Sequence, residues 1–340
     1  MLRKKFKKIA TKFAIIGVMI MTACSSNGGA NNEGVRSPDA LVIPPLERPE
    51  IQEQTPIERP EVDLSDPYFP ESPDLEKWRL IWSDEFDGDS LNLNYWEIMT
   101  GTGGAFGLTG WGNDEAQYYH GDNISVENGF LRIEARIENR SSPGERASRY
   151  TSARIRSIGP EAPQILYGRI EARISMPQGA GLWPAFWMLP INSPYGGWAA
   201  SGEIDIMEVM GRLPRRSSGA LHFGGGWPNN VYDHGATDIP DGRNITDFNV
   251  YAIEWEPEQI RWYVNDLNFF NMTRWHSQDE NGERRPFPAP FDVPFHVLLN
   301  LAVGGHFDPQ GTAALNDAIF PAYMYVDYVR VYEQIPNEVD

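Results

Sequence analysis

The sequence predicts an all-β protein built as a sandwich of two curved antiparallel sheets. Short runs rich in β-branched and aromatic residues follow one another from Arg79 to Tyr332, and turn signals such as Glu127–Gly129 separate them. No stretch of a dozen residues carries the apolar stripe of an amphipathic helix. One domain, residues 76–335, accounts for all of these runs within the chain of 340 residues.

Each expected strand is a short run in which apolar side chains alternate with polar ones or dominate the segment. In chain order the expected strands are Arg79–Phe86, Ile124–Val126, Phe130–Ile137, Thr151–Ser157, Gly168–Met176, Ala185–Leu189, Glu203–Val209, Gly219–Phe223, Asn249–Glu256, Gln259–Val264, Phe295–Leu301 and Tyr325–Tyr332.

Residues 1–24 are typical of an export signal. Lys and Arg gather at the start, and the apolar run Phe13–Met21 that follows is too short to span a bilayer. The segment ends in Ala23–Cys24 and resembles a bacterial lipoprotein signal, which implies that Cys24 is acylated and anchors the protein to the cell envelope, at the outer membrane or cell surface if the cell is Gram-negative. An ordinary signal peptide with an incidental Cys is the alternative. Cys24 is the only Cys, so the chain forms no internal disulfide.

Residues 25–75 are expected to form a solvated tether between this anchor and the domain. The stretch is rich in Asn and Gly, then in Pro and Glu, and has no periodicity that would build a core.

The composition favours a neutral partner. The formal charge is −18, so the surface repels nucleic acid and other anionic polymers. The 11 Trp and the 12% aromatic content suit stacking on flat sugar faces, although many of these rings must belong to the core.

The segment Ser201–Gly211 carries three carboxylates that alternate with large apolar residues. In a strand Glu203 and Asp205 share one face, but strict alternation would drive Glu208 into the core, where an unpaired carboxylate is costly. A β-bulge at Ile206–Met207 removes the conflict by returning Glu208 to the acidic face.

Carboxyls crowded on one face raise one another's pKa, so one stays protonated while its neighbour ionises. Glycoside hydrolysis needs such a pair, with one carboxyl protonated and the other ionised. The alternative is that the acids are only the solvated face of an antiparallel sheet.

Further polar and aromatic residues flank this strand in the sequence. The loop Gly110–Tyr119, which contains Asn113, suits hydrogen bonding and stacking to a sugar, and Arg154 shares a strand face with Arg156. Spacing also places two Trp on one face of the run Leu182–Pro190, and a His follows the acidic strand by a single hairpin. These residues are Trp183, Trp187 and His222.

Residues 78–333 resemble a glycoside hydrolase family 16 domain of the laminarinase (endo-1,3-β-glucanase) type. The matching stretches are Trp82–Asp87, Gly110–Tyr119, Tyr167–Arg173, Gly181–Pro190, Gly202–Glu208, Tyr251–Trp255 and Val326–Tyr332. The resemblance implies a β-jelly-roll with a concave substrate cleft and retaining endo-hydrolysis of β-1,3-glucan, with mixed-linkage β-1,3-1,4-glucan as a further substrate.

The same resemblance implies roles for individual residues. Glu203 is expected to be the nucleophile, Glu208 the general acid/base, and Asp205 the group that holds Glu203. Asn113, Arg154, Trp183, Trp187 and His222 are expected to bind the sugar.

The resemblance also implies a structural Ca²⁺, held by the Asp327 side chain and by backbone oxygens near Glu85 and Gly129. The protein is expected to act as a monomer that meets a membrane only through its lipid. Three alternatives stay open: a hydrolase of agar-, porphyran- or carrageenan-type polysaccharide, a non-catalytic glucan-binding protein on the same fold, and a glucanosyltransferase in which a sugar replaces water in attacking the retaining intermediate.

Overall fold

The computed structural model describes residues 62–68, 74, 76–279 and 281–336, all within the unit Thr55–Asp340. In this part of the chain no helix is long and apolar enough to cross a bilayer. Cys24 and most of the expected tether lie outside the described residues.

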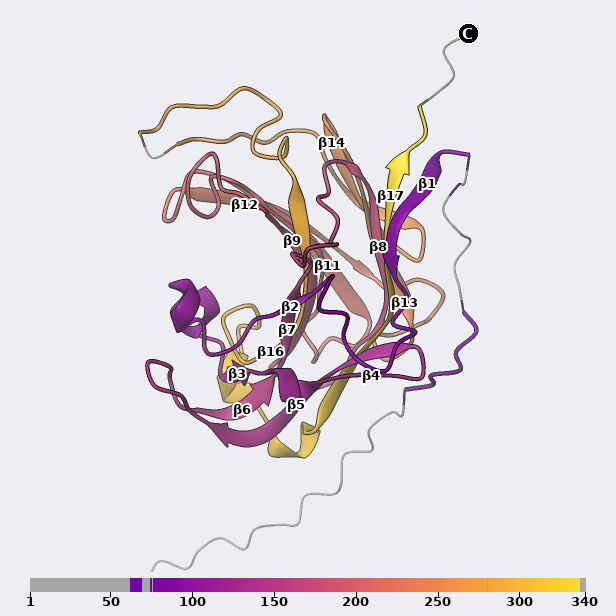
Figure 1. The fold of residues 1–340 in the computed structure, drawn as a ribbon, viewed down its shortest axis with the longest axis vertical. Helices are drawn as coiled ribbons and strands as arrows, with labels where there is room; N and C mark the ends of the chain where they lie inside the picture. Colours follow the sequence, from indigo (N-terminus) through magenta and orange to yellow (C-terminus); the bar gives the residue numbers. More distant parts are fainter. Residues whose placement is uncertain (1–61, 69–73, 75, 280, 337–340) are drawn as a thin grey trace, which may run out of the picture. The chain divides into compact units, whose positions relative to one another are not determined.

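Strands dominate the described chain, and they form two sheets that each use strands from distant parts of the sequence (Figure 1). The first sheet contains β15 (Leu267–Met272), β14 (Gln259–Val264), β13 (Asn249–Glu256), β8 (Gly168–Ser175), β17 (Ala322–Gln334), β5 (Phe130–Arg140), β6 (Ser148–Ser152) and β3 (Gln117–Tyr119) in spatial order, with β1 (Trp78–Asp84) beside β17 and β4 (Ile124–Glu127) beside β5. The second sheet contains β12 (Asn230–Asp238), β11 (Arg216–Gly224), β10 (Glu203–Glu208), β9 (Leu182–Pro190), β16 (Phe295–Val303), β7 (Arg154–Arg156) and β2 (Glu97–Ile98) in spatial order.

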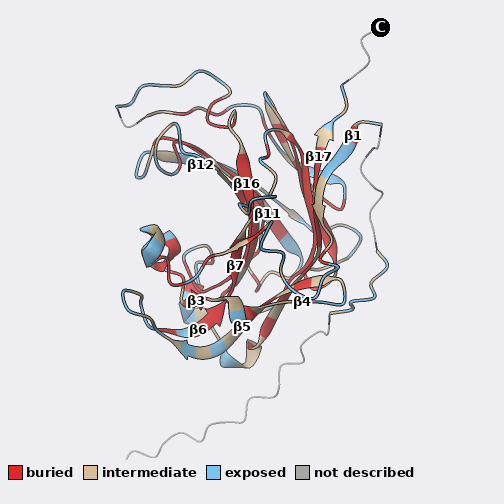
Figure 2. Cartoon of the chain, in the orientation of Figure 1, coloured by how far each residue is buried: buried red, intermediate tan, exposed pale blue. Residues whose placement is uncertain are grey.

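The core lies between the two sheets. One cluster of buried side chains joins Ile170 and Trp262 of the first sheet to Phe186, Ile204 and Leu299 of the second. The inner strand β16 of the second sheet is buried over its whole length (Figure 2). Side chains of β8 alternate between the core and the outer face, and each sheet has an outer face that carries polar side chains.

The predicted all-β sandwich is confirmed, and two strands, β13 and β14, have the predicted bounds. The predicted single strand Thr151–Ser157 is wrong, because this segment is divided between β6 and β7. Residues up to Ser152 pair in the first sheet and those from Arg154 pair in the second, so the chain crosses between the sheets at the fully buried Ala153.

Four strands were not predicted: β2, β3, β12 and β15. β12 and β15 are edge strands with few core-facing side chains, so they are held mainly by backbone pairing to one neighbour. β3 lies inside the segment that was expected to be a loop.

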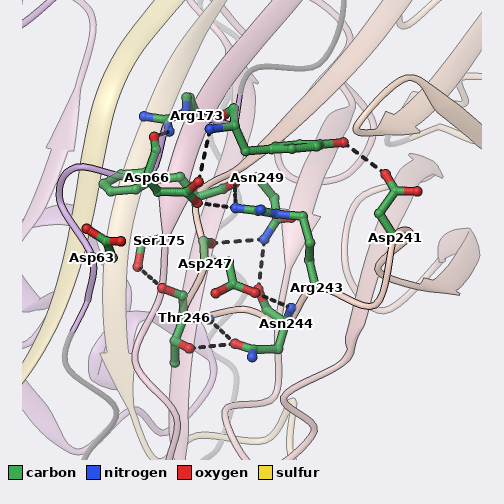
Figure 3. A network of polar contacts seen from close by, with 12 residues as sticks. Asp63, Asp66, Arg173, Ser175, Asp241, Arg243, Asn244, Thr246, Asp247 and Asn249 are labelled. Atoms are coloured by element: carbon green, nitrogen blue, oxygen red, sulfur yellow. Dashed lines mark hydrogen bonds and ion pairs between the residues drawn. The ribbon is translucent and has the colours of Figure 1, made fainter.

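Part of the segment expected to be a tether, residues 62–68, lies against the outer face of the first sheet (Figure 3). Arg173 of β8 donates to the backbone oxygen of Asp66 at 2.7 Å. The Asp66 carboxylate pairs with Arg243, whose guanidinium lies 4.0 Å from the Tyr68 ring centroid. The Tyr68 hydroxyl donates to Asp241 at 3.0 Å. Two largely buried arginines thus fix this segment to the domain.

Candidate active site

The three acids of β10 lie together on the outer face of the second sheet. β9 and β11 pair with β10 on either side, while Ile204, Ile206 and Met207 are fully buried in the core. Glu203 and Glu208 remain partly accessible, and Asp205 between them is only 4% exposed. The acidic face predicted from the alternation is therefore present.

The predicted bulge at Ile206–Met207 is also present. Four residues of β10, Asp205 to Glu208, are matched by three on β9, from Trp187 to Ala185. The register against β11 shifts at the same place. The extra residue leaves both bulge side chains in the core and returns Glu208 to the acidic face.

The opposite sheet holds this bulge. The indole Nε1 of Trp262 on β14 donates to the backbone oxygen of Asp205 at 2.8 Å, through the core. That approach needs a glycine at position 219 on β11, because a Cβ there would lie 2.4 Å from Cδ1 of Trp262. The geometry of the acids thus depends on Trp262, which no pattern in the sequence singled out.

Each outer carboxylate accepts one indole hydrogen bond. Trp198 Nε1 donates to Glu203 Oε2 at 2.9 Å, and Trp183 Nε1 donates to Glu208 Oε1 at 2.9 Å. His222, opposite Glu203 in the register, places Nε2 3.1 Å from Asp205 Oδ2 and 3.7 Å from Glu203 Oε1. The imidazole therefore joins the acid cluster itself.

The three carboxyls are hard to ionise together. Burial raises the pKa of Glu203, Asp205 and Glu208, each to about 8, and the charge of Asp205 adds to the rise at both glutamates. His222 partly offsets the rise in the pKa of the two glutamates. Because the groups interact this closely, their protons leave as steps of the whole cluster. At neutral pH the cluster therefore keeps at least one carboxyl protonated, which can serve as a proton donor.

Trp187 lies beside Asp205 in the register and is held from two sides. Its Nε1 donates to Asn300 Oδ1 at 2.8 Å, and the guanidinium of Arg154 lies 4.7 Å from its ring centroid. The same guanidinium lies 4.6 Å from the ring centroid of Trp111. Arg154 is 5% exposed, so it supports Trp187 from beneath the surface.

The interpretation of Gly110–Tyr119 as a sugar-stacking loop is wrong for its aromatic residues. Trp111, Tyr118 and Tyr119 are all buried, and the last two belong to β3. The Tyr119 hydroxyl donates to the buried carboxyl of Glu115 at 3.0 Å. The segment packs against the sheet. It contains one predicted sugar ligand, Asn113, and this residue is partly exposed.

Asn113 lies close to Trp183, at the Glu208 end of the acidic face. A Cβ on Gly305 would lie 3.1 Å from the Trp183 ring and 3.3 Å from the backbone oxygen of Asn113, so a glycine lets these segments approach. Phe307 stacks on Trp183 with ring centroids 5.0 Å apart. The structure thus groups Asn113 and Trp183 near Glu208, and His222 near Glu203.

Two exposed aromatic residues near Glu203 were not predicted. Trp198 is 40% exposed and lies 5.4 Å from the His222 ring, and Tyr232 of β12 is 59% exposed and stacks on that ring at 5.5 Å. Glu203, His222 and Tyr232 form one row across three strands. A Trp in the Gly-rich turn before Glu203 was the available signal for Trp198; none pointed to Tyr232, because β12 was not predicted.

The expected metal ligands lie on the other sheet. On the outer face of the first sheet, Asp327 of β17 accepts a hydrogen bond from Arg173 at 2.8 Å. Glu85, which follows β1, forms an ion pair with Arg330 through two hydrogen bonds. Gly129 has a φ of 81° in the tight turn between β4 and β5.

Known proteins are similar to this chain in sequence and fold. Residues 112–319 match the family model described as Glycosyl hydrolases family 16. The chain is 42% identical over 274 residues to Glucan endo-1,3-beta-glucosidase A1 of Niallia circulans, covering 78% of this chain and 39% of that protein. It is 41% identical over 271 residues to Beta-glucanase of Rhodothermus marinus, covering 76% of this chain and 86% of that one. Among solved structures, endo-beta-1,3-glucanase from Pyrococcus furiosus matches with a TM-score of 0.65 at 41% identity, over 76% of this chain and 96% of that chain.

Proposed function

Because this chain belongs to glycosyl hydrolase family 16, we propose that it cleaves β-1,3-glucosidic bonds within laminarin-type β-glucans by a retaining mechanism. The observation that carries the proposal is the bulged strand β10, which presents two indole-bound glutamates on either side of a buried aspartate. The relatives named as β-1,3-glucanases support this choice of substrate. Mixed-linkage β-1,3-1,4-glucan is a second substrate of the same proposal.

In this mechanism Glu203 attacks the anomeric carbon while protonated Glu208 donates its proton to the leaving oxygen. The bond to the aglycone breaks, and a glycosyl ester of Glu203 forms. Glu208, now ionised, takes a proton from water, which attacks the same carbon and releases Glu203. Two inversions give a product with retained β configuration, and the carboxyls of such a pair stand about 5–5.5 Å apart. The bulge brings Glu208 closer to Glu203 than a regular strand would.

Asp205 and His222 tune the nucleophile in this scheme. His222 Nε2 lies 3.7 Å from Glu203 Oε1, so the imidazole favours the ionised form of Glu203. Asp205 holds His222 at 3.1 Å and its charge keeps a proton on a neighbouring glutamate.

Trp183 and Trp187 are proposed to stack on the sugars near the scissile bond, and Asn113, Arg154 and His222 to bind their hydroxyls. An aromatic contact of this kind is worth about 0.5–1.5 kcal/mol. Arg154 contributes by holding the Trp187 ring as well, since it lies beneath that ring.

The test is product analysis on laminarin, lichenan and agarose side by side. Endo-hydrolysis of β-1,3-glucan releases a ladder of intermediate oligosaccharides from laminarin early in the reaction, and none from agarose. Release from agarose alone would replace the proposal with an agar-type hydrolase. Tight binding of laminarin with no products would favour a glucan-binding protein.

A structural Ca²⁺ at Asp327 is a further proposal. Carboxylate and backbone oxygens are the donors that Ca²⁺ prefers, and the named residues offer these. Burial raises the pKa of Asp327, and the charge of Glu85 adds to the rise, although Arg173 and Arg330 oppose it, so a cation would stabilise the ionised carboxylate. A bound ion would tie the first and last strands together. Chelator should then lower the melting temperature, and Asp327→Asn should abolish that sensitivity.

We further propose that Cys24 is acylated and anchors the protein to the cell envelope. The basic start, the apolar run and Ala23–Cys24 support this. Wild type should fractionate with membranes and Cys24→Ser should not, and a variant that still sediments with them would count against acylation.

A further inference from the structure

A set of metal-ligating atoms lies inside the acid cluster. Among the described residues, Glu203, Asp205 and His222 form a group whose donor atoms all lie within 4.8 Å of one another. Nε2 of His222 is 3.1 Å from Asp205 Oδ2 and 3.7 Å from Glu203 Oε1. One nitrogen and two oxygens from adjacent strands thus converge on one point.

The two separations that involve His222 are close to those of a tetrahedral zinc site. Zinc binds imidazole nitrogen and carboxylate oxygen at about 2.0–2.2 Å, which places two tetrahedral ligand atoms about 3.3–3.6 Å apart. The two observed separations, 3.1 Å and 3.7 Å, lie on either side of that range. The donor oxygens of Glu203 and Asp205 lie within 4.8 Å of each other, so these two side chains would close on a bound ion to complete three ligands, and a water would take the fourth position.

The aspartate supplies a second, independent observation. Its Oδ2 atom is buried and accepts no hydrogen bond from the residues that the structure describes, although His222 Nε2 lies 3.1 Å from it. A buried polar atom normally has a partner, so this oxygen is suited to a cation.

The surrounding contacts hold the donors in place. Trp198 occupies Oε2 of Glu203 and leaves Oε1 facing His222, whose ring lies between Trp198 and Tyr232. Trp262 fixes the Asp205 backbone.

We propose that Glu203, Asp205 and His222 form a site for a divalent transition metal of the zinc type, and that the bound metal reversibly inhibits the enzyme. Ca²⁺ and Mg²⁺ prefer six or more oxygen ligands, so this site selects against them and differs from the one at Asp327. Inhibition rests on the proposed function, because the metal would occupy the carboxylate that acts as nucleophile. Metal binding itself does not rest on it.

The second imidazole nitrogen of His222 determines the metal affinity that we expect. Nδ1 of His222 is buried without a hydrogen-bond partner in the described part of the chain, whereas strong zinc sites support that nitrogen with a carboxylate or carbonyl. Losing such support typically costs about 10–100-fold in affinity. Binding is therefore expected in the micromolar range, where a chelator reverses it.

Calorimetric titration of the untagged full chain with Zn²⁺, without substrate, tests the site. His222→Ala and Asp205→Asn should each weaken binding more than about tenfold, since losing a ligand costs more than losing its support. Glu208→Gln, an acid outside the set, and His234→Ala, a nearby exposed imidazole, should bind as wild type does. Bound Co²⁺ should show the intense visible absorption of tetrahedral coordination. Circular dichroism verifies that each variant is folded.

A second experiment measures laminarin hydrolysis with added Zn²⁺ and tests whether the bound metal inhibits the enzyme. The Zn²⁺ concentration that halves activity should match the dissociation constant from calorimetry, in wild type and in His234→Ala alike. EDTA should restore the activity. Zn²⁺ that binds equally well to His222→Ala, or not at all at 1 mM, overturns the site. Binding at the site without inhibition would overturn the role of Glu203 in the proposed function and leave the site intact.

Discussion

At the residue scale, the roles of the two glutamates follow from their places on β10. Glu203 lies beside His222, which favours its ionised form, whereas Glu208 lies at the other end of the bulge. With a substrate that carries a good leaving group, azide should rescue Glu208→Ala and give a glycosyl azide of β configuration, because Glu203 still forms the covalent intermediate.

The same azide treatment of Glu203→Ala should give α product or none. Chirality at the anomeric carbon, read by NMR, distinguishes the two results. Interchanged outcomes would mean that the nucleophile is Glu208.

Glu208 also carries a stability cost that depends on pH. Burial raises its pKa from the ordinary 4.5 to about 8. Below pH 4.5 both folded and unfolded forms hold the proton; as pH rises towards 8 the unfolded form loses it first, so the native state is progressively disfavoured. Glu208→Gln removes this cost and keeps an oxygen for Trp183.

The melting temperature of Glu208→Gln should therefore exceed that of wild type at pH 8, with a difference that shrinks towards pH 4. Glu258→Gln, in an exposed turn, is the matched control and should show no such trend. A gain that is the same at both pH values would rule out titration of Glu208 as its cause.

At the element scale, the bulge of β10 depends on contacts across the core. Gly219→Ala places a Cβ 2.4 Å from Trp262 and 2.9 Å from the Asp205 oxygen, so β10 or the indole must move. Overpacking of this kind costs about 1–3 kcal/mol. We expect kcat to fall more than KM changes, because the relative placement of Glu203 and Glu208 is what shifts.

Trp262→Phe tests the same contact from the other side. It removes the indole donor and leaves the buried backbone oxygen of Asp205 unpaired, which should lower the free energy of unfolding by about 1–3 kcal/mol. Gly88→Ala, where a Cβ meets only ordinary contacts, is the control for the glycine. Full activity in Gly219→Ala would show that the bulge does not need Trp262.

Sequence alone predicts the elements whose side chains alternate between core and surface. The bulge could be placed because an unpaired buried Glu208 is costly, a local argument. The support from Trp262 could not, because it joins residues 57 positions apart. Nor could the edge strand β12, whose run Tyr232–Gly235 has no apolar face, or the crossing at Ala153, which needs knowledge of both sheets.

At the scale of the whole molecule, the described segment before β1 contributes to stability. Asp66→Ala leaves the largely buried guanidinium of Arg243 without its carboxylate, at an expected cost of about 1–3 kcal/mol. That lowers the melting temperature by roughly 2–4 °C per kcal/mol in a domain of this size. Asp63→Ala, whose carboxylate hydrogen-bonds to Ser65 within the same segment, is the matched control. Equal melting temperatures for the two variants would contradict a stabilising role for Asp66.

The attachment of Asp66 and Tyr68 has a practical consequence for immobilisation. These residues lie on the outer face of the first sheet, where Arg173 holds them, whereas Glu203 and Glu208 lie on the outer face of the second sheet. A bead, biosensor chip or fused carrier joined to the chain just before Val62 therefore begins on the opposite side of the sandwich from the acids. Long polysaccharides could then reach the catalytic face of a captured enzyme without passing the support.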